Sequence, residues 1–148
     1  MNAKTILVAV DFSDVTQGVV DAARSMAAAF GGRIILLHVE EPEPDFVGFE
    51  AGPQPVRVNV AHEVRATHRQ LEGLKQTLGE GGVEVMALHI QGPGVEKILH
   101  EAQQQGAELI VIGSHGHGAI YNLLVGGVTS GVLKGATCPV LVVPAPRK

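Results

Sequence analysis

The sequence predicts an α/β domain built on a single open parallel β-sheet with helices on both faces. Short apolar runs alternate with segments of helical periodicity, and the order βαβαβαβαβ is typical of parallel strands joined by right-handed crossovers. Hydrophobic residues make up 45% of the chain and aromatic residues only 3%, so Val, Leu, Ile and Ala must form the core, as in a helix-covered sheet. A length of 148 residues fits one domain, 1–148.

Five apolar runs are the expected strands. Most are apolar at successive positions, as strands buried on both faces are. The third alternates between apolar and polar residues more than the others, which favours a place at the edge of the sheet. The expected strands are Thr5–Val10, Ile34–Val39, Val83–Ile90, Leu109–Ile112 and Val140–Val143.

Four segments between these runs have apolar residues at helical spacing. Polar residues are candidate caps at the start of the first two, and Pro93 suits the first turn of the third because proline has no N–H to leave unpaired. Glycines follow the first two helices, where a left-handed residue is common. The expected helices follow Ser13, Asn59, Pro93 and Gly127 and end near Gly31, Leu78, Gln105 and Ala136.

The stretch Glu40–Pro55 is rich in proline, glycine and acidic residues and predicts neither a helix nor a strand. We expect a mobile connector here. Its two aromatic residues, Phe46 and Phe49, are candidates for a lid that folds back over the domain.

Charge and cysteine content limit the classes of partner. The net charge is −4 and the eleven Lys and Arg are scattered, whereas nucleic-acid binding needs a basic face. No apolar run approaches the ~20 residues that span a bilayer. Cys138 is the only cysteine, so no intrachain disulfide can form, which suits a reducing compartment. We therefore expect a cytoplasmic protein that binds neither nucleic acid nor membranes.

The stretch Glu108–Pro144 contains the strongest functional signal. An apolar strand runs into the glycine-rich loop Gly113–Gly118, and a second glycine pair, Gly126 and Gly127, precedes a helix. Glycines let the backbone approach a phosphate closely, and the N-terminus of a helix favours an anion. The alternative is that these glycines serve only tight turns and close packing of helix on sheet.

The spacing G-x2-G-x9-G of Gly113, Gly116 and Gly126 resembles the ATP-binding signature of the universal stress protein family. The resemblance covers the whole chain apart from the connector. It also includes the segments ILVAVDFSD (Ile6–Asp14), LLHVEE (Leu36–Glu41), QGPGVEKIL (Gln91–Leu99) and CPVLVVP (Cys138–Pro144).

The resemblance implies the strand order 3-2-1-4-5 and a stress-response regulatory module that binds ATP, or ADP or AMP, with Mg²⁺. Ligands of such sheets bind where the strand order reverses, here between strands one and four, which end at Asp11 and Gly113. The resemblance also implies a homodimer formed through the last strand, Val140–Val143. We expect no enzymatic activity beyond slow, incidental ATP hydrolysis, since no Walker motif is present.

Ten residues are the candidate nucleotide site. Asp11 is expected to bind a ribose hydroxyl or a water on Mg²⁺, with capping of the next helix as the alternative. Val39 is expected to contact adenine through its backbone, unless it is an ordinary strand-end valine. The candidates are Asp11, Val39, Ile112, Gly113, His115, Gly116, Gly126, Gly127, Val128 and Thr129.

The sequence departs from the pattern of the family it resembles at two points. ATP-binding members usually have Ser or Thr where this chain has Gly127, and they often have a basic residue in the loop, whereas none lies between Lys97 and Lys134. A lost hydrogen bond to a charged phosphate costs about 1–3 kcal/mol, so binding should be weaker unless Thr129 or Ser130 substitutes. The alternative is a dimeric stress-response interaction protein with a vestigial nucleotide site.

The sequence pattern of the histidines does not indicate a metal or catalytic site. His115 and His117 form an H-x-H pair without a third ligand at suitable spacing. A hydrolase that uses Ser114 and His115 would need a nucleophile elbow, and no G-x-S-x-G is present. Five further histidines have no partner pattern and are interpreted as structural or surface groups: His38, His62, His68, His89 and His100.

Overall fold

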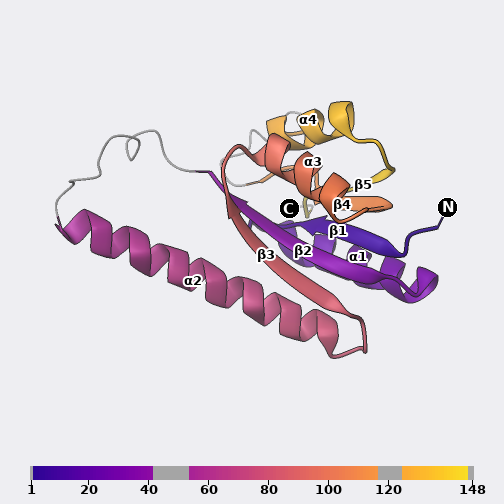
Figure 1. The fold of residues 1–148 in the computed structure, drawn as a ribbon, viewed down its shortest axis with the longest axis horizontal. Helices are drawn as coiled ribbons and strands as arrows, with labels where there is room; N and C mark the ends of the chain where they lie inside the picture. Colours follow the sequence, from indigo (N-terminus) through magenta and orange to yellow (C-terminus); the bar gives the residue numbers. More distant parts are fainter. Residues whose placement is uncertain (1, 42–53, 117–124, 147–148) are drawn as a thin grey trace.

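The computed structural model describes residues 2–41, 54–116 and 125–146, and within 54–64 it describes the helix but not the side chains. The fold is a five-stranded sheet in which every neighbouring pair is parallel, in the order β3-β2-β1-β4-β5 (Figure 1). This confirms the expected fold class and strand order. The elements are β1 (Thr5–Ala9), α1 (Thr16–Phe30), β2 (Arg33–Glu40), α2 (Gln54–Gly79), β3 (Val85–Gln91), α3 (Gly94–Gln104), β4 (Leu109–Gly113), α4 (Gly127–Gly135) and β5 (Val140–Val143).

Helices cover both faces of the sheet, with α1 and α2 on one and α3 and α4 on the other (Figure 1). Because side chains alternate along a strand, the central strands contribute to both cores. In β2, for example, Ile34 and Leu36 pack with α1 and α2, while Ile35 and Leu37 pack with α3 and α4. These four side chains are fully buried, which explains why the strand is apolar at successive positions.

β3 lies at one edge of the sheet, as its alternating pattern predicted, and β5 lies at the other. No helix among the described residues is both long and apolar enough to cross a bilayer. The expected lid residues Phe46 and Phe49, and the loop residue His117, lie outside the described residues.

Two helix starts differ from the prediction. Ser13 does not cap α1, which begins at Thr16 after Val15 and has no side-chain cap. The reason is local: the Asp11 carboxylate accepts the backbone N–H of Ser13 (3.0 Å), and Phe12 takes a left-handed conformation with φ 62°. α2 begins at Gln54, five residues before the predicted cap Asn59, because Pro55 is well tolerated in the first turn of a helix.

Candidate functional site

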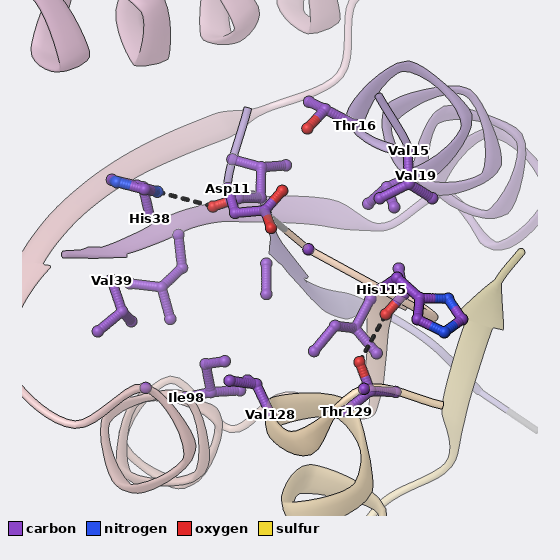
Figure 2. A pocket seen from close by; sticks show the side chains of 18 of the residues that line it. Asp11, Val15, Thr16, Val19, His38, Val39, Ile98, His115, Val128 and Thr129 are labelled. Carbon is purple, nitrogen blue, oxygen red and sulfur yellow. Dashed lines mark hydrogen bonds between the residues drawn. The ribbon is translucent and has the colours of Figure 1, made fainter. Parts of the chain in front are cut away.

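A cavity of about 680 Å³ opens at the carboxyl ends of β1 and β4, where the strand order reverses. This volume is in the range of small-molecule sites. In Figure 2, Asp11 lies on one side of the space, and Ile98, Val128 and Thr129, from α3 and α4, lie on the other. All ten candidates line the cavity: Asp11, Val39, Ile112, Gly113, His115, Gly116, Gly126, Gly127, Val128 and Thr129.

The turn after β1 aims Asp11 at the glycine loop. One carboxylate oxygen, Oδ1, accepts the N–H of Ser13, so the side chain is held in place by its own turn. The other, Oδ2, lies so close to Gly116 that an added Cβ there would overlap it. Gly116 therefore lets the loop after β4 pass next to the Asp11 carboxylate, and the two expected parts of the site are indeed neighbours.

The end of β4 is packed tightly between two helices. A Cβ built on Gly113 would lie 2.5 Å from Cγ1 of Val15, just before α1, so glycine is required here for packing. On the α4 side, the buried Thr129 hydroxyl donates to the Gly113 carbonyl oxygen at 2.6 Å (Figure 2). The Thr129 proton is therefore used within the protein, which does not favour this hydroxyl as the replacement for the missing phosphate donor.

The N-terminus of α4 suits an anion better than the N-terminus of α3, which also lies at the cavity. Helical geometry leaves the N–H groups of Gly127, Val128 and Thr129 without acceptors inside the helix, since Ser130 N–H is the first to bond back, to Gly126. At the N-terminus of α3, by contrast, the Glu41 carboxylate already accepts the N–H of Gly94 (2.9 Å). An anionic group is thus expected at α4, where dipole and free N–H groups coincide.

β2 extends beyond its neighbour β1 at the cavity. The β1–β2 register ends at Ala9 paired with Leu37, and Val10 N–H bonds to the Leu37 carbonyl oxygen. In a parallel strand, the N–H and C=O of every second residue point to the same neighbour. Those of Leu37 point towards β1, so those of Val39 point to the same side, beyond Ala9, the last residue of β1. Val39 therefore presents a donor and an acceptor to the cavity.

The lining of the cavity has an uneven charge distribution. It includes three carboxylates, Asp11, Glu40 and Glu41, and contains no Lys or Arg among the described residues. Its other side chains are mainly aliphatic. Thr16 also lines it, and the oxygen of its shielded hydroxyl has no hydrogen-bond partner within the described ranges. A polyphosphate here would depend on backbone N–H groups and on a bound cation for charge balance.

Ser114 and His115 do contact each other, with 3.0 Å between Oγ and Nδ1. However, Ser114 is buried, its Oγ also accepts the N–H of Ala145, and it does not line the cavity as described. A nucleophile must reach the substrate, so this geometry gives no support to the Ser114–His115 hydrolase.

Sequence reasoning missed part of the lining and one cluster beside it. The additional lining residues come from α1, from the start of α3 and from the end of β2, and they are recognisable only through tertiary packing. His38 and His89, interpreted as isolated groups, lie side by side with ring centroids 5.4 Å apart and have Glu40 next to them. The added lining residues include Val15, Thr16, Val19, His38, Glu40, Glu41 and Ile98.

A sequence model described as the universal stress protein family matches residues 2–144. The chain belongs to this family. A universal stress protein from Thermus aquaticus is 37% identical over 143 residues, which cover 95% of this chain and 98% of that protein. The solved structure of MJ0577, a universal stress protein of Methanocaldococcus jannaschii, superimposes with a TM-score of 0.85 at 27% identity and covers both chains fully.

Two further universal stress protein structures were solved with adenine nucleotides. One is a complex with cAMP, with a TM-score of 0.70 at 21% identity, covering 99% of this chain and 100% of the other. The second, from Archaeoglobus fulgidus, is a complex with dAMP, with a TM-score of 0.68 at 21% identity, covering 97% and 99%. At this identity the likeness establishes the fold that the three proteins share.

Proposed function

We propose that this universal stress protein is a regulatory stress-response module that binds ATP with Mg²⁺ in the cavity between the ends of β1 and β4. The observation that carries the proposal is the convergence of Asp11, Val39 and the glycines Gly113, Gly116, Gly126 and Gly127 on one cavity at the point of strand reversal. The adenine nucleotides held by two members of the family support the choice of ligand. The other adenine nucleotides, ADP and AMP, share the part of the site that binds adenosine.

The two ends of the cavity suit the two ends of the nucleotide. The backbone donor and acceptor of Val39 match the hydrogen-bonding edge of adenine, and the aliphatic walls at Ile98 and Ile112 suit the faces of the ring. The phosphates would lie at the N-terminus of α4, against the N–H groups of Gly127 and Val128. Asp11 lines the same cavity, and its carboxylate is proposed to bind ribose.

Magnesium fits the chemistry of the site. Mg²⁺ prefers oxygen ligands and keeps several waters, so it is usually held by one or two carboxylates together with the phosphates. Asp11 provides a carboxylate beside the glycine loop, and the described lining offers no basic side chain to balance phosphate charge. Bound Mg²⁺ would supply that positive charge.

Binding and release, rather than catalysis, are proposed as the activity. The Ser114 hydroxyl is buried and bonded to other groups, and the sequence has no Walker motif. Any ATP hydrolysis is expected to be slow and incidental. The proposed setting is the cytoplasm, which suits a chain with a single cysteine.

Replacement of Asp11 by asparagine is the sharpest test of nucleotide binding, because asparagine can keep the hydrogen bond that holds the turn to Ser13. In Asp11→Asn an amide oxygen can still accept the Ser13 N–H, whereas the charge that would bind ribose or hydrated Mg²⁺ is lost. A charge-assisted bond of about 1.5–3 kcal/mol corresponds to a roughly 10- to 100-fold loss of Mg-ATP affinity, measured by calorimetry. The matched control is Asp21→Asn on the exposed face of α1. Equal affinity in Asp11→Asn and the wild type would contradict this role of Asp11.

A homodimer through β5 is the second part of the proposal. The carbonyl oxygens of Pro139 and Val143 face β4, where they accept N–H bonds from Ile110 and Ser114. Alternation therefore turns the backbone groups of Val140 and Val142 outwards, at an edge that a second copy can extend. Val142→Pro removes one outward N–H without removing a bond to β4, so light scattering should show a folded monomer. A folded Val142→Pro dimer would contradict this interface.

The competing proposal is a dimeric interaction protein whose nucleotide site is vestigial. Gly127 and the absence of basic side chains from the described lining favour it. Thermal melts with millimolar Mg-ATP separate the two, because a ligand at ~100 times its dissociation constant adds about 2.7 kcal/mol of stability. An unchanged melting temperature, in protein purified without nucleotide, would support the vestigial site.

A further inference from the structure

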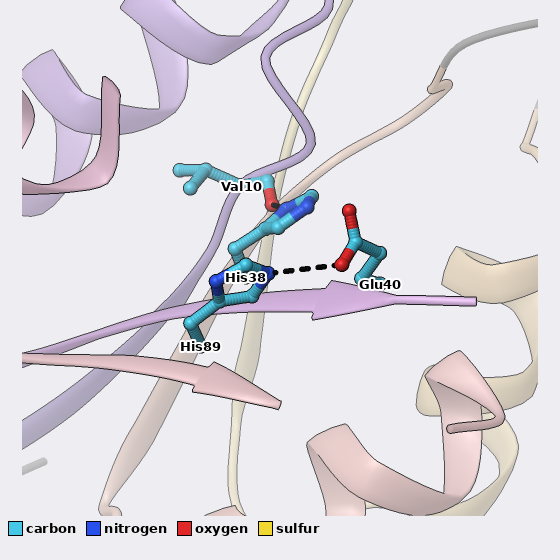
Figure 3. A network of polar contacts seen from close by, with 4 residues as sticks. All are labelled: Val10, His38, Glu40 and His89. Atoms are coloured by element: carbon cyan, nitrogen blue, oxygen red, sulfur yellow. Dashed lines mark hydrogen bonds and ion pairs between the residues drawn. The ribbon is translucent and has the colours of Figure 1, made fainter. Parts of the chain in front are cut away.

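Three side chains with metal-binding groups meet at the ends of β2 and β3, on the sheet face covered by α1 and α2 (Figure 3). His38 and Glu40 are two residues apart on β2 and so share a face, and the strand register pairs His38 with His89 of β3. One ligand atom from each residue lies within 4.8 Å of the other two. The cluster therefore brings together two imidazoles and a carboxylate.

Glu40 and His89 are spaced as two ligands of one metal ion are. Oε2 of Glu40 and Nε2 of His89 are 3.3 Å apart (Figure 3). Both atoms are shielded from solvent, yet neither makes a hydrogen bond of acceptable geometry to the described residues. Two ligands that bind Zn²⁺ at about 2.0–2.1 Å with tetrahedral angles are roughly 3.3–3.4 Å apart. A cation between them would satisfy both atoms at their present separation.

His38 is held with one ring nitrogen available. Its Nδ1 lies 2.8 Å from the carbonyl oxygen of Val10, and because a carbonyl only accepts, Nδ1 must carry the proton (Figure 3). In the neutral ring the lone pair is then on Nε2. Metal-binding histidines are oriented in this way, by a hydrogen bond from the other nitrogen to a carbonyl or carboxylate. Burial of His38 and its contact with Phe12, at 4.9 Å between ring centroids, fix the ring further.

We propose that His38, Glu40 and His89 form a binding site for Zn²⁺. Two imidazoles and a carboxylate are a ligand set that zinc uses, with the fourth position left for water. Mg²⁺ prefers an all-oxygen octahedron, so this site is distinct from the one proposed for Mg²⁺ with the nucleotide. His68 stacks on His89 with 6.4 Å between centroids, but its Nε2 faces Glu72 at 4.0 Å, so it is outside the ligand set.

The site is a neighbour of the nucleotide cavity. His38 and Glu40 both line that cavity, and they flank Val39 on the same strand. Zinc would therefore fix the end of β2, the segment whose backbone is proposed to bind adenine.

Zinc binding is tested with the full-length chain, without an affinity tag, stripped with EDTA and free of nucleotide. Titration with Zn²⁺ alone in a calorimeter should show one ion per chain. His89→Gln and Glu40→Gln should each weaken binding by at least about tenfold, since even indirect partners of a ligand contribute 10- to 100-fold. His100→Gln, an exposed histidine on α3, is the matched control and should bind as the wild type does.

Circular dichroism melts establish that each variant is folded, and Co²⁺ in place of Zn²⁺ reports the coordination through its visible absorption. A tetrahedral Co²⁺ spectrum that is lost in His89→Gln would support the site. Absence of saturable binding, or binding that is equal in His89→Gln and the wild type, would show that Glu40 and His89 are only an ion pair. Because no nucleotide is present in these titrations, failure of zinc binding and failure of Mg-ATP binding can be told apart.

Discussion

The hydroxyl of Thr129 donates a 2.6 Å hydrogen bond to the carbonyl oxygen of Gly113. This bond joins the first turn of α4 to the end of β4, and both partners are buried. It therefore fixes the helix N-terminus relative to the strand end, the two elements between which the phosphates are proposed to bind.

Thr129→Val should destabilise the protein because it leaves the buried Gly113 carbonyl oxygen unpaired. A buried group without its partner costs about 1–3 kcal/mol, which urea unfolding would measure. Thr129→Ser keeps the hydroxyl and is the control. A loss in Thr129→Ser with none in Thr129→Val would show that the methyl group of Thr129, rather than its hydrogen bond, stabilises this junction.

Gly113→Ala should be destabilising because its Cβ would lie 2.5 Å from Val15. Overpacking of a core typically costs about 1–3 kcal/mol. Val15→Ala makes room, so the double variant should lose less stability than the sum of the two single changes. Additive losses of stability in this double-mutant cycle would contradict a clash between the added Cβ and the Val15 side chain. Bulkier residues at Gly113 are therefore unsuitable probes of nucleotide binding.

Gly127→Ser should strengthen Mg-ATP binding, because it adds the hydroxyl that ATP-binding relatives usually carry at this position. A Cβ on Gly127 meets nothing within 4 Å, so the change does not disturb the fold. One hydrogen bond to a charged phosphate predicts a roughly 10- to 100-fold lower Kd in calorimetry. The control is Gly73→Ser, at a similarly open helical position in α2. Unchanged affinity in Gly127→Ser would argue against phosphates at α4.

Cys138 should react slowly with alkylating reagents, because burial raises the pKa of its thiol and the thiolate is the reactive form. At pH 8, iodoacetamide should modify it more slowly than a small-molecule thiol, and unfolding in urea should remove the difference. The folded state binds this proton more tightly than the unfolded state does, so the contribution of Cys138 to stability is fully present below the unfolded pKa of the thiol and is lost as the pH rises through its higher folded pKa. A rapid reaction in the folded protein would contradict this burial.

The fold could be predicted because each strand carries its own signal. Successive apolar residues, as in Ile34–Leu37, predict a strand covered on both faces, and the alternation of strands with helices predicts a parallel sheet. The start of α1 could not be predicted, because the Asp11 carboxylate accepts the N–H of Ser13 in a turn that precedes the helix.

The candidate site was predictable in part for a similar reason. Asp11 follows β1 and Gly113 ends β4, two strands that are far apart in sequence, and the family's strand order makes them neighbours. His38 and Glu40 share a face by simple alternation, but His89 joins them only through the register between β2 and β3. No local pattern encodes that register, so the cluster was visible only in the fold.

Calorimetric titration of Mg-ATP into the wild type, Val128→Trp and Leu133→Trp tests the central claim most directly. Val128 and Leu133 both have exposed side chains on α4, with exposed fractions of 41% and 44%. Of the two, only Val128 lines the cavity. The proposal predicts that tryptophan at Val128 fills the space and weakens binding by at least about tenfold, or 1.4 kcal/mol, whereas tryptophan at Leu133 changes nothing. Equal affinities in all three proteins, or no binding to the wild type, would contradict a nucleotide in this cavity.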